Sequence, residues 1–359
     1  MDRTLLVTVD MGKREDWTAE ERATELSELA GSSGAKVIEN MVVKRRAPCP
    51  SHFIGSGKAE ELASICANGK IRLVIFNNDL TGTQRKNLED SIGARVIDRT
   101  QLILDIFARR AHSNEGKLQV ELAQLSYLMP RLTDNGTKFS RLGGGIGTSG
   151  PGEQKLEVDR RRIRDRIARL KKELVGLGSR RGMMRKHRGK FRIPSVAIVG
   201  YTNTGKSALL NAITGSSIVV RDKLFATLDP TIRRLTMPDR REILFIDTVG
   251  FLKELPHHLI EAFKATLEEA AEADLLIHLV DASHPKVKEQ AEAVYKVLGS
   301  IGALDKPIIT VLNKIDKVSP QEVERLKALL GATAAISALS KEGLAGLVEK
   351  IAKSISVFT

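Results

Sequence analysis

The chain has 359 residues, of which 42% are apolar, and a formal net charge of +13. This length suits two or three domains with substantial cores. No stretch reaches the roughly 18 apolar residues of a membrane span, the first residues lack the pattern of a secretion signal, and the two cysteines are too few for a disulfide framework. We therefore expect a cytoplasmic protein without a transmembrane segment.

Strand-like and helix-like runs alternate in residues 1–112. The strand-like runs are Leu5–Val9, Lys36–Ile38, Arg72–Phe76 and Arg95–Asp98, and a polar helix is expected over residues 18–30. Such alternation predicts a small α/β subdomain with a parallel sheet.

Gly55–Lys58 resembles half of a phosphate-binding loop. It lacks the GxxxxGK spacing and a preceding buried strand, so we expect a turn. A second nucleotide site there remains an alternative.

Residues 113–190 contain two apolar stripes at alternating spacings of four and three, which predict an antiparallel helical hairpin. The stripes are Leu118, Leu122, Leu125, Met129 and Leu132, then Leu156, Ile163, Ile167, Leu170, Leu174 and Leu177. Residues 133–152 join them with seven glycines in twenty positions. A loop this long and glycine-rich indicates a probe for a partner surface, with simple disorder as the alternative.

Nearly all the excess charge lies in residues 155–192, where sixteen Lys or Arg oppose four acidic residues and leave +12. Such a run is typical of a protein that binds a polyanion, and the scarcity of aromatic residues favours contact with an RNA backbone. The alternatives are a solvated helix face and peripheral contact with an acidic membrane. The RNA-binding candidates are Arg141, Gly143, Gly144, Gly145, Arg160, Arg161, Arg162, Arg164 and Arg166.

Residues 191–359 carry the motifs of a Ras-like P-loop GTPase domain. Gly200–Ser207 follows the apolar run Val196–Val199 and precedes a helix-like segment, so its backbone N–H groups can surround a phosphate. Lys206 is expected to reach the β- and γ-phosphates, and Ser207 to bind Mg²⁺. This loop alone does not distinguish ATP from GTP.

Guanine selectivity is predicted by Asn313–Asp316. The Asp316 carboxylate can accept from the adjacent N1–H and N2–H₂ donors of guanine, a pair that adenine lacks. Asn313 and Lys314 are expected to hold the loop and cover the ring, and Ser337, Ala338 and Leu339 to supply backbone contact.

Two further segments are expected to sense the γ-phosphate. A buried strand delivers Asp247 to water around Mg²⁺ and the Gly250 N–H to the phosphate, and Thr227 is favoured over Thr231 to complete the metal shell. We therefore assign catalytic roles to Lys206, Thr227 and Gly250, and metal roles to Ser207, Thr227 and Asp247. The predicted nucleotide-binding set is Asn203, Thr204, Gly205, Lys206, Ser207, Ala208, Asp247, Gly250, Asn313, Lys314, Asp316, Ser337, Ala338 and Leu339.

Phe251 follows Gly250, at the position where Ras-like proteins carry the glutamine that orients the attacking water. Slow intrinsic hydrolysis and stimulation by a partner are therefore expected. His257 and His258 are nearby, but an exposed pair at a helix start is more often solvated than catalytic.

Five motifs resemble the HflX family of translational GTPases, and this resemblance spans nearly the whole chain. They are Phe53–Lys58, Leu104–Phe107, Glu115–Leu125, Gly150–Glu153 and Phe225–Thr231.

The resemblance implies a GTPase that binds the RNA and proteins of the large ribosomal subunit, with the glycine loop directed toward the peptidyl-transferase region. It also implies splitting of stalled or idle ribosomes under stress. Some relatives continue into a further small domain beyond the helix expected at Leu344–Ile355, so contacts of that domain are in doubt here. GTP and GDP are the expected ligands, Mg²⁺ the cofactor and a monomer the expected state. A GTPase acting in large-subunit assembly or RNA modification, and an RNA-binding scaffold with a vestigial nucleotide site, are the alternatives.

Overall fold

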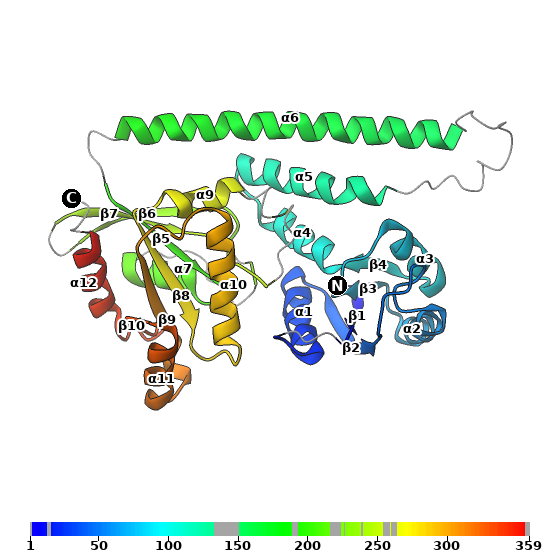
Figure 1. Ribbon diagram of the computed structural model, residues 1–359, viewed down its shortest axis with the longest axis horizontal. Coiled ribbons are helices and arrows are strands. Elements are labelled where there is room, and N and C mark those ends of the chain that lie inside the picture. Colours follow the sequence, from blue (N-terminus) through cyan, green and yellow to red (C-terminus); the bar gives the residue numbers. More distant parts are fainter. Residues whose placement is uncertain are drawn as a thin grey trace. The chain divides into compact units, whose positions relative to one another are not determined.

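The computed structural model describes residues 2–12, 16–132, 151–188, 193–215, 224–225, 227–237, 240–253, 259 and 264–355, with backbone alone at 151–156, 180–188 and 264–266 (Figure 1). The chain divides into two compact units. One comprises Met1–Arg109 and Leu118–Val175, and the other comprises Arg110–Lys117 and Gly176–Thr359.

The first unit is built on a four-stranded parallel sheet of order β2-β1-β3-β4, which confirms the predicted parallel sheet. Its elements are β1 (Arg3–Asp10), α1 (Ala19–Ser33), β2 (Lys36–Lys44), α2 (Ser56–Gly69), β3 (Leu73–Phe76), α3 (Gly82–Ile92), β4 (Arg95–Asp98) and α4 (Arg99–Arg110). β1 is buried along six successive residues, as expected of an inner strand covered on both faces.

Local sequence sets the ends of these helices. Thr18 and Glu21 form a capping box at the start of α1, and Gly34 ends that helix in the left-handed region at φ 83°. The turn predicted over Gly55–Lys58 is wrong beyond its first residue, because α2 begins at Ser56. Gly55 adopts φ +86°, and a Cβ there would lie 2.9 Å from Nη1 of Arg45, so the glycine allows this close approach.

The hairpin consists of α5 (Asn114–Leu128), a 3₁₀ turn (Met129–Arg131) and α6 (Pro151–Arg188). Arg166 donates to both carboxylate oxygens of Glu121 at 2.7 and 2.8 Å, and Arg160 Nη2 donates to the Leu132 carbonyl at 3.3 Å. These pairings show that α5 and α6 run antiparallel, as the two stripes predict. Leu122 of the first stripe and Leu170 of the second are buried.

The second unit contains a six-stranded sheet of order β10-β9-β8-β5-β7-β6, in which β6 alone is antiparallel to its neighbour. Its first elements are β5 (Ser195–Gly200), α7 (Lys206–Thr214), β6 (Thr231–Thr236), β7 (Glu242–Asp247), α9 (Lys264–Glu272) and β8 (Leu275–Asp281). The remaining elements are α10 (Val287–Ser300), β9 (Ile308–Asn313), a 3₁₀ turn (Ile315–Lys317), α11 (Pro320–Leu330), β10 (Ala334–Ala335) and α12 (Leu344–Ile355).

Helices cover both faces of this sheet (Figure 1). Apolar residues of α7 and α12 share one core with β5 and β7–β9, whereas α10 and α11 pack in a second core with β8 and β9. The chain order of the strands reverses at β5, and ligands of open α/β sheets bind at the carboxyl ends of strands beside such a reversal. No helix within the described parts of the chain is long and apolar enough to cross a membrane.

Candidate nucleotide-binding site

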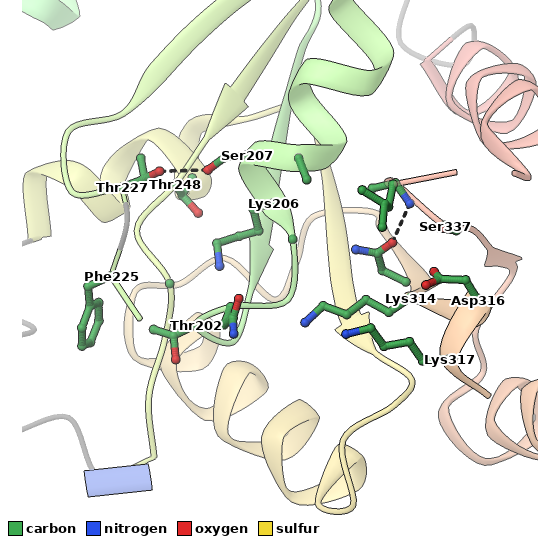
Figure 2. Close-up of a pocket in the computed structure, with 17 residues that line it drawn as sticks. Thr202, Lys206, Ser207, Phe225, Thr227, Thr248, Lys314, Asp316, Lys317 and Ser337 are labelled. Carbon is green, nitrogen blue, oxygen red and sulfur yellow. Dashed lines mark hydrogen bonds between the residues drawn. The ribbon is translucent and has the colours of Figure 1, made fainter. Parts of the chain in front are cut away.

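A cavity of about 310 Å³ lies at the carboxyl edge of the second sheet (Figure 2). Seventeen residues line it, including twelve of the predicted nucleotide-binding set and Thr227. The twelve are Asn203, Gly205, Lys206, Ser207, Ala208, Gly250, Asn313, Lys314, Asp316, Ser337, Ala338 and Leu339. The structure thus brings five separate sequence segments to one concave surface.

Sequence reasoning missed four lining residues, which are Thr202, Phe225, Thr248 and Lys317. Each is adjacent to, or within two positions of, a predicted residue, so proximity in sequence was the available signal. Two predicted residues, Thr204 and Asp247, lie behind the lining. Thr204 is 1% exposed, and its carbonyl accepts from Asn313 Nδ2 at 2.7 Å.

The P-loop connects β5 to α7 through backbone conformations that glycine and asparagine adopt readily. Asn203 has φ 61° and Gly205 has φ 93°. A Cβ on Gly205 would overlap Asn313 Nδ2. Glycine is therefore required for the close approach of this loop to β9 as well as for its left-handed backbone.

Asn313 joins three parts of the cavity. Its Nδ2 donates to Thr204 in the P-loop, and its Oδ1 accepts from the Ala338 N–H at 3.0 Å. The side chain is 2% exposed, so both bonds are shielded from water and their loss would leave buried polar groups unsatisfied. Asn313 thereby fixes the P-loop relative to the segment that contains Ala338.

Charged side chains mark the end of the cavity that lies away from Ser207 (Figure 2). Lys314 adopts φ 60°, and its Nζ lies 2.6 Å from Oδ2 of the nearly buried Asp281. This ion pair directs the lysine along the cavity wall, whereas the Asp316 side chain is exposed. Leu339 is 85% exposed and offers an apolar surface to a flat ligand.

Three oxygen-bearing side chains converge at the other end. Ser207 Oγ donates to Asp247 Oδ2 at 2.6 Å and lies 2.9 Å from Thr227 Oγ1, which in turn donates to the same carboxylate oxygen at 3.2 Å. Asp247 is fully buried, and burial raises its pKa although these bonds and Lys206 oppose the shift. Thr231 instead begins β6, opposite Asp247 in the ladder, and does not line the cavity.

Lys206 lies beside this cluster and is 7% exposed. Its ammonium group donates to the carbonyls of Gly200 at 3.2 Å and Tyr201 at 2.7 Å. Burial lowers the pKa of Lys206 to about 8, although the nearby Asp247 carboxylate acts in the opposite direction. A phosphate that entered the cavity would supply the counter-charge that the buried ammonium needs.

The segment after β7 is attached directly to the P-loop. The Thr202 N–H donates to the Phe251 carbonyl at 2.8 Å, and the Phe251 N–H donates to the Gly200 carbonyl at 3.1 Å. A Cβ at Gly250 would lie 2.8 Å from Thr202 Cα, so only glycine fits between the two loops. Phe251 is 1% exposed and is not among the residues that line the cavity.

Other candidates from the sequence are placed as follows. Arg161, Arg162 and Arg164 are exposed on α6, whereas Arg160 and Arg166 are half-buried and bonded within the hairpin. Arg141, Gly143, Gly144, Gly145, His257 and His258 lie outside the described residues. No cluster of metal-ligating His, Cys, Asp and Glu occurs among the residues that the structure describes.

The reversed strand order at β5, the P-loop and the convergent Ser207, Thr227 and Asp247 define a P-loop GTPase. Residues 20–108, 110–188 and 195–314 match families described as "GTP-binding GTPase N-terminal", "GTP-binding GTPase Middle Region" and "50S ribosome-binding GTPase". The GTPase HflX of Caldanaerobacter subterraneus subsp. tengcongensis is 51% identical over 99% of this chain and 81% of its own length. The chain belongs to the HflX family of GTPases, and it is a GTP hydrolase.

Further comparisons agree with this membership. The GTPase HflX of Escherichia coli is 47% identical over 83% of this chain and 70% of its own length. A crystal structure of a GTP-binding protein from Sulfolobus solfataricus in complex with GDP shares 26% identity, covers both chains completely and gives a TM-score of 0.53. A second GDP complex, named SsGBP, shares 27% identity with a TM-score of 0.56, over 100% of this chain and 99% of its own.

Proposed function

We propose that this GTPase is a cytoplasmic translation factor that binds the large ribosomal subunit and splits stalled or idle ribosomes under stress. The observation that carries the proposal is the group of exposed arginines on α6, Arg161, Arg162 and Arg164, in a chain whose catalytic domain matches a family described as binding the 50S subunit. Closely spaced exposed cations suit the phosphate backbone of ribosomal RNA.

The arginines of α6 divide into two groups by their contacts. Arg162 and Arg164 are 77% and 56% exposed, with Asp159 at 3.8 Å and Glu157 at 3.4 Å. Exposed pairs of this kind contribute little stability, so both cations can exchange partners for phosphate. The bidentate pairing of Arg166 with Glu121 supports the hairpin itself. Among the candidates, Arg161, Arg162 and Arg164 are therefore the stronger RNA contacts.

We further propose that Asp316 selects guanine, and that Lys206, Thr227 and Gly250 contact the phosphates. The support is their common position on the cavity lining, with Asp316 at one end and Thr227 at the other. Phe251 is buried and has no hydrogen-bonding group, so it is unsuited to orienting water. A group supplied in trans is worth about 10³ to 10⁵ in rate in GTPases that depend on one.

Mg²⁺ is the proposed cofactor, held by the hydroxyls of Ser207 and Thr227 with Asp247 behind them. The residues fit the ion, because hard oxygen donors converge and Oδ1 of the buried Asp247 has no hydrogen-bond partner within the described structure. When bound, the ion would neutralise charge on the β- and γ-phosphates. Ser207→Ala should weaken the Mg²⁺ dependence of GDP affinity, measured by calorimetry with and without a chelator.

GTP hydrolysis with and without purified large subunits tests the ribosome proposal. We expect strong stimulation by subunits, and loss of stimulation when residues 143–147 are removed. The double variant Arg162→Ala/Arg164→Ala should weaken subunit binding and reduce its salt dependence, by roughly one unit of slope per lost phosphate contact.

The matched control is Lys288→Ala/Arg325→Ala, which removes the same charge from residues that are 60% and 66% exposed and also paired along their own helices. This control should bind subunits normally. If both double variants lost the same subunit affinity, binding would depend only on the net charge of the protein. That result would contradict a specific role for α6.

Splitting is tested by sedimentation of intact ribosomes with the full-length protein and GTP, GDP or a non-hydrolysable GTP analogue. The proposal expects the analogue complex to split ribosomes better than the GDP complex, because a ligand shifts an equilibrium only by its differential affinity. Equal splitting with GDP would overturn that coupling. Stimulated hydrolysis without splitting would favour the alternative role in subunit assembly.

A further inference from the structure

Asp229 makes a cluster of hydrogen bonds to a segment more than a hundred residues away in sequence. Its Oδ2 accepts from the backbone N–H groups of His112 and Ser113, both at 2.8 Å, and its Oδ1 accepts from Ser113 Oγ at 2.5 Å. All three residues belong to the second unit. A half-buried carboxylate with three donors is a strong local attachment.

The contacted segment is shaped to receive this carboxylate. Ser113 immediately precedes α5, and its Oγ accepts from the Gly116 N–H at 2.9 Å. Gly116 is buried, and a Cβ there would overlap Asp229 Oδ1 and lie 3.0 Å from Ser113 Oγ. Gly116 has no need of a left-handed backbone, since it lies in the first turn of a helix. Its lack of a side chain makes room for Asp229.

Asp229 is also close in sequence to the cluster that is expected to respond to nucleotide. Thr227, two residues earlier, bonds to Ser207 and Asp247. Two residues span at most about 7 Å of chain, so a withdrawal of Thr227 larger than a small shift would pull on Asp229. After Asp229, Thr231 enters β6 and is paired with β7. The segment between Thr227 and the first residue of β6, Thr231, is therefore short.

α5 begins at Asn114 in the second unit and continues without interruption to Leu128 in the first. One continuous helix thus connects the segment that Asp229 contacts with the hairpin. A hydrogen-bonded helix is stiff on the scale of one turn, which suits it to transmit a change at its first turn.

We propose that Asp229 is a positioning residue that couples the state of Thr227 to the start of α5. With Thr227 at Ser207, Asp229 holds His112 and Ser113; when Thr227 withdraws, this attachment is released. This inference rests on the proposed role of Thr227 at the γ-phosphate, by which a nucleoside triphosphate favours the inward Thr227 and so stabilises the attachment. By thermodynamic reciprocity, loss of the attachment must weaken the triphosphate more than the diphosphate.

The test compares the full-length protein with Asp229→Ala and Gly116→Ala, which remove the attachment from opposite sides. We expect the affinity for a non-hydrolysable GTP analogue to fall about tenfold in each, within the usual range of coupling between sites, and the GDP affinity to change about twofold or less. Asp229→Asn keeps one acceptor oxygen and should lie between the wild type and Asp229→Ala.

Amide hydrogen exchange supplies an independent readout. The His112 and Ser113 amides should be better protected with the GTP analogue than with GDP, and this difference should disappear in Asp229→Ala. Ser319→Ala is the control for simple loss of a helix cap, because Ser319 Oγ accepts from the Glu322 N–H at the start of α11. It should leave the ratio of the two affinities unchanged.

Two results would overturn the proposal. One is an equal change, or no change, in both affinities in the Asp229→Ala and Gly116→Ala proteins. The other is equal protection of the two amides in both nucleotide states, which would make Asp229 a cap for α5 and nothing more. If Asp229→Ala fails to fold, Asp229→Asn and the exchange measurement on the unmodified protein decide the question.

Discussion

Asn313→Asp is the most informative single substitution at the base of the cavity. It keeps the oxygen that accepts from Ala338 N–H but replaces the Nδ2 donor with an oxygen facing the Thr204 carbonyl at about the present 2.7 Å. Asn313→Ala, by comparison, removes both bonds. The two variants therefore separate the loss of a donor from the burial of a charge.

The magnitudes follow from burial, since the side chain is 2% exposed. Each buried partner left without a hydrogen bond costs about 1–3 kcal/mol, so Asn313→Ala, which leaves two, should lose roughly 2–6 kcal/mol of the free energy of unfolding. Asn313→Asp leaves one partner unsatisfied and adds an unpaired buried carboxylate, a change of about 3–5 kcal/mol when a buried pair is broken. At pH 8 it should be at least as destabilised as Asn313→Ala.

The pH dependence distinguishes the two variants. Burial next to a carbonyl raises the pKa of the introduced carboxyl above its value in the unfolded chain, so the folded state binds the extra proton and loses stability as pH rises through that raised pKa. At pH 5 the protonated group can donate to Thr204 and restore the missing bond. Asn313→Asp should therefore recover stability, relative to wild type, between pH 8 and pH 5, whereas Asn313→Ala should not.

Denaturant unfolding followed by far-ultraviolet circular dichroism measures these differences, with amide exchange in β5 and β9 as a local readout. Trp17 is the single tryptophan of the chain and lies buried in the first unit, so its fluorescence reports that unit and should not respond. The reasoning would be refuted if the difference in the free energy of unfolding between Asn313→Asp and wild type stayed constant from pH 8 to pH 5. It would also be refuted if Asn313→Ala lost less than about 0.5 kcal/mol, which is the effect of an ordinary surface substitution.

Three further outcomes are expected at the site. Burial lowers the pKa of Lys206 to about 8, and a bound phosphate raises it, so nucleotide binding should take up a proton above pH 8. Calorimetry should therefore show full GDP affinity below pH 8 and a loss of affinity of up to about tenfold per pH unit above pH 8. Phe251→Gln buries an amide at a position 1% exposed, so it should cost about 1–3 kcal/mol without raising intrinsic hydrolysis; a faster rate would show that the side chain reaches the cavity. Asp316→Asn removes the paired acceptor and should weaken GTP by roughly 10- to 150-fold, as for hydrogen bonds to a charged group; an unchanged guanine preference would contradict the assignment.

Local sequence predicts much of this fold because buried strands and helix ends have local causes. Every residue of the run Val196–Val199 is apolar, as in a strand buried on both faces of a sheet, and the run lies in β5. The last helix spans Leu344–Ile355, as expected. The sequence does not predict β6, because none of its six residues is buried in this edge strand and four of them are Thr or Arg. The division of the chain into residues 1–112, 113–190 and 191–359 stays a prediction.

Site residues close to a motif are predictable, and those brought in by tertiary structure are not. The P-loop and Asn313–Asp316 carry a recognisable spacing because a phosphate and a purine have fixed shapes. Nothing near Asp229 indicates its contact with His112, since the two are separated by 117 positions. In the same way, the sequence shows Lys314 but not the Asp281 carboxylate that holds it.

The connection between β7 and the P-loop constrains how far Gly250 can move. Partner residues on β5 and β7 are 49 positions apart at Ile198 and Asp247, but 50 positions apart at Tyr201 and Phe251. Between these two paired positions, the chain through Gly250 is thus one residue longer than the chain from Ile198 to Tyr201. Tyr201 also accepts from the Lys253 N–H through its hydroxyl at 2.9 Å, which secures the far end. One extra residue allows a peptide plane next to Gly250 to rotate, whereas any larger movement of Gly250 first has to break the pairing of Tyr201 with Phe251.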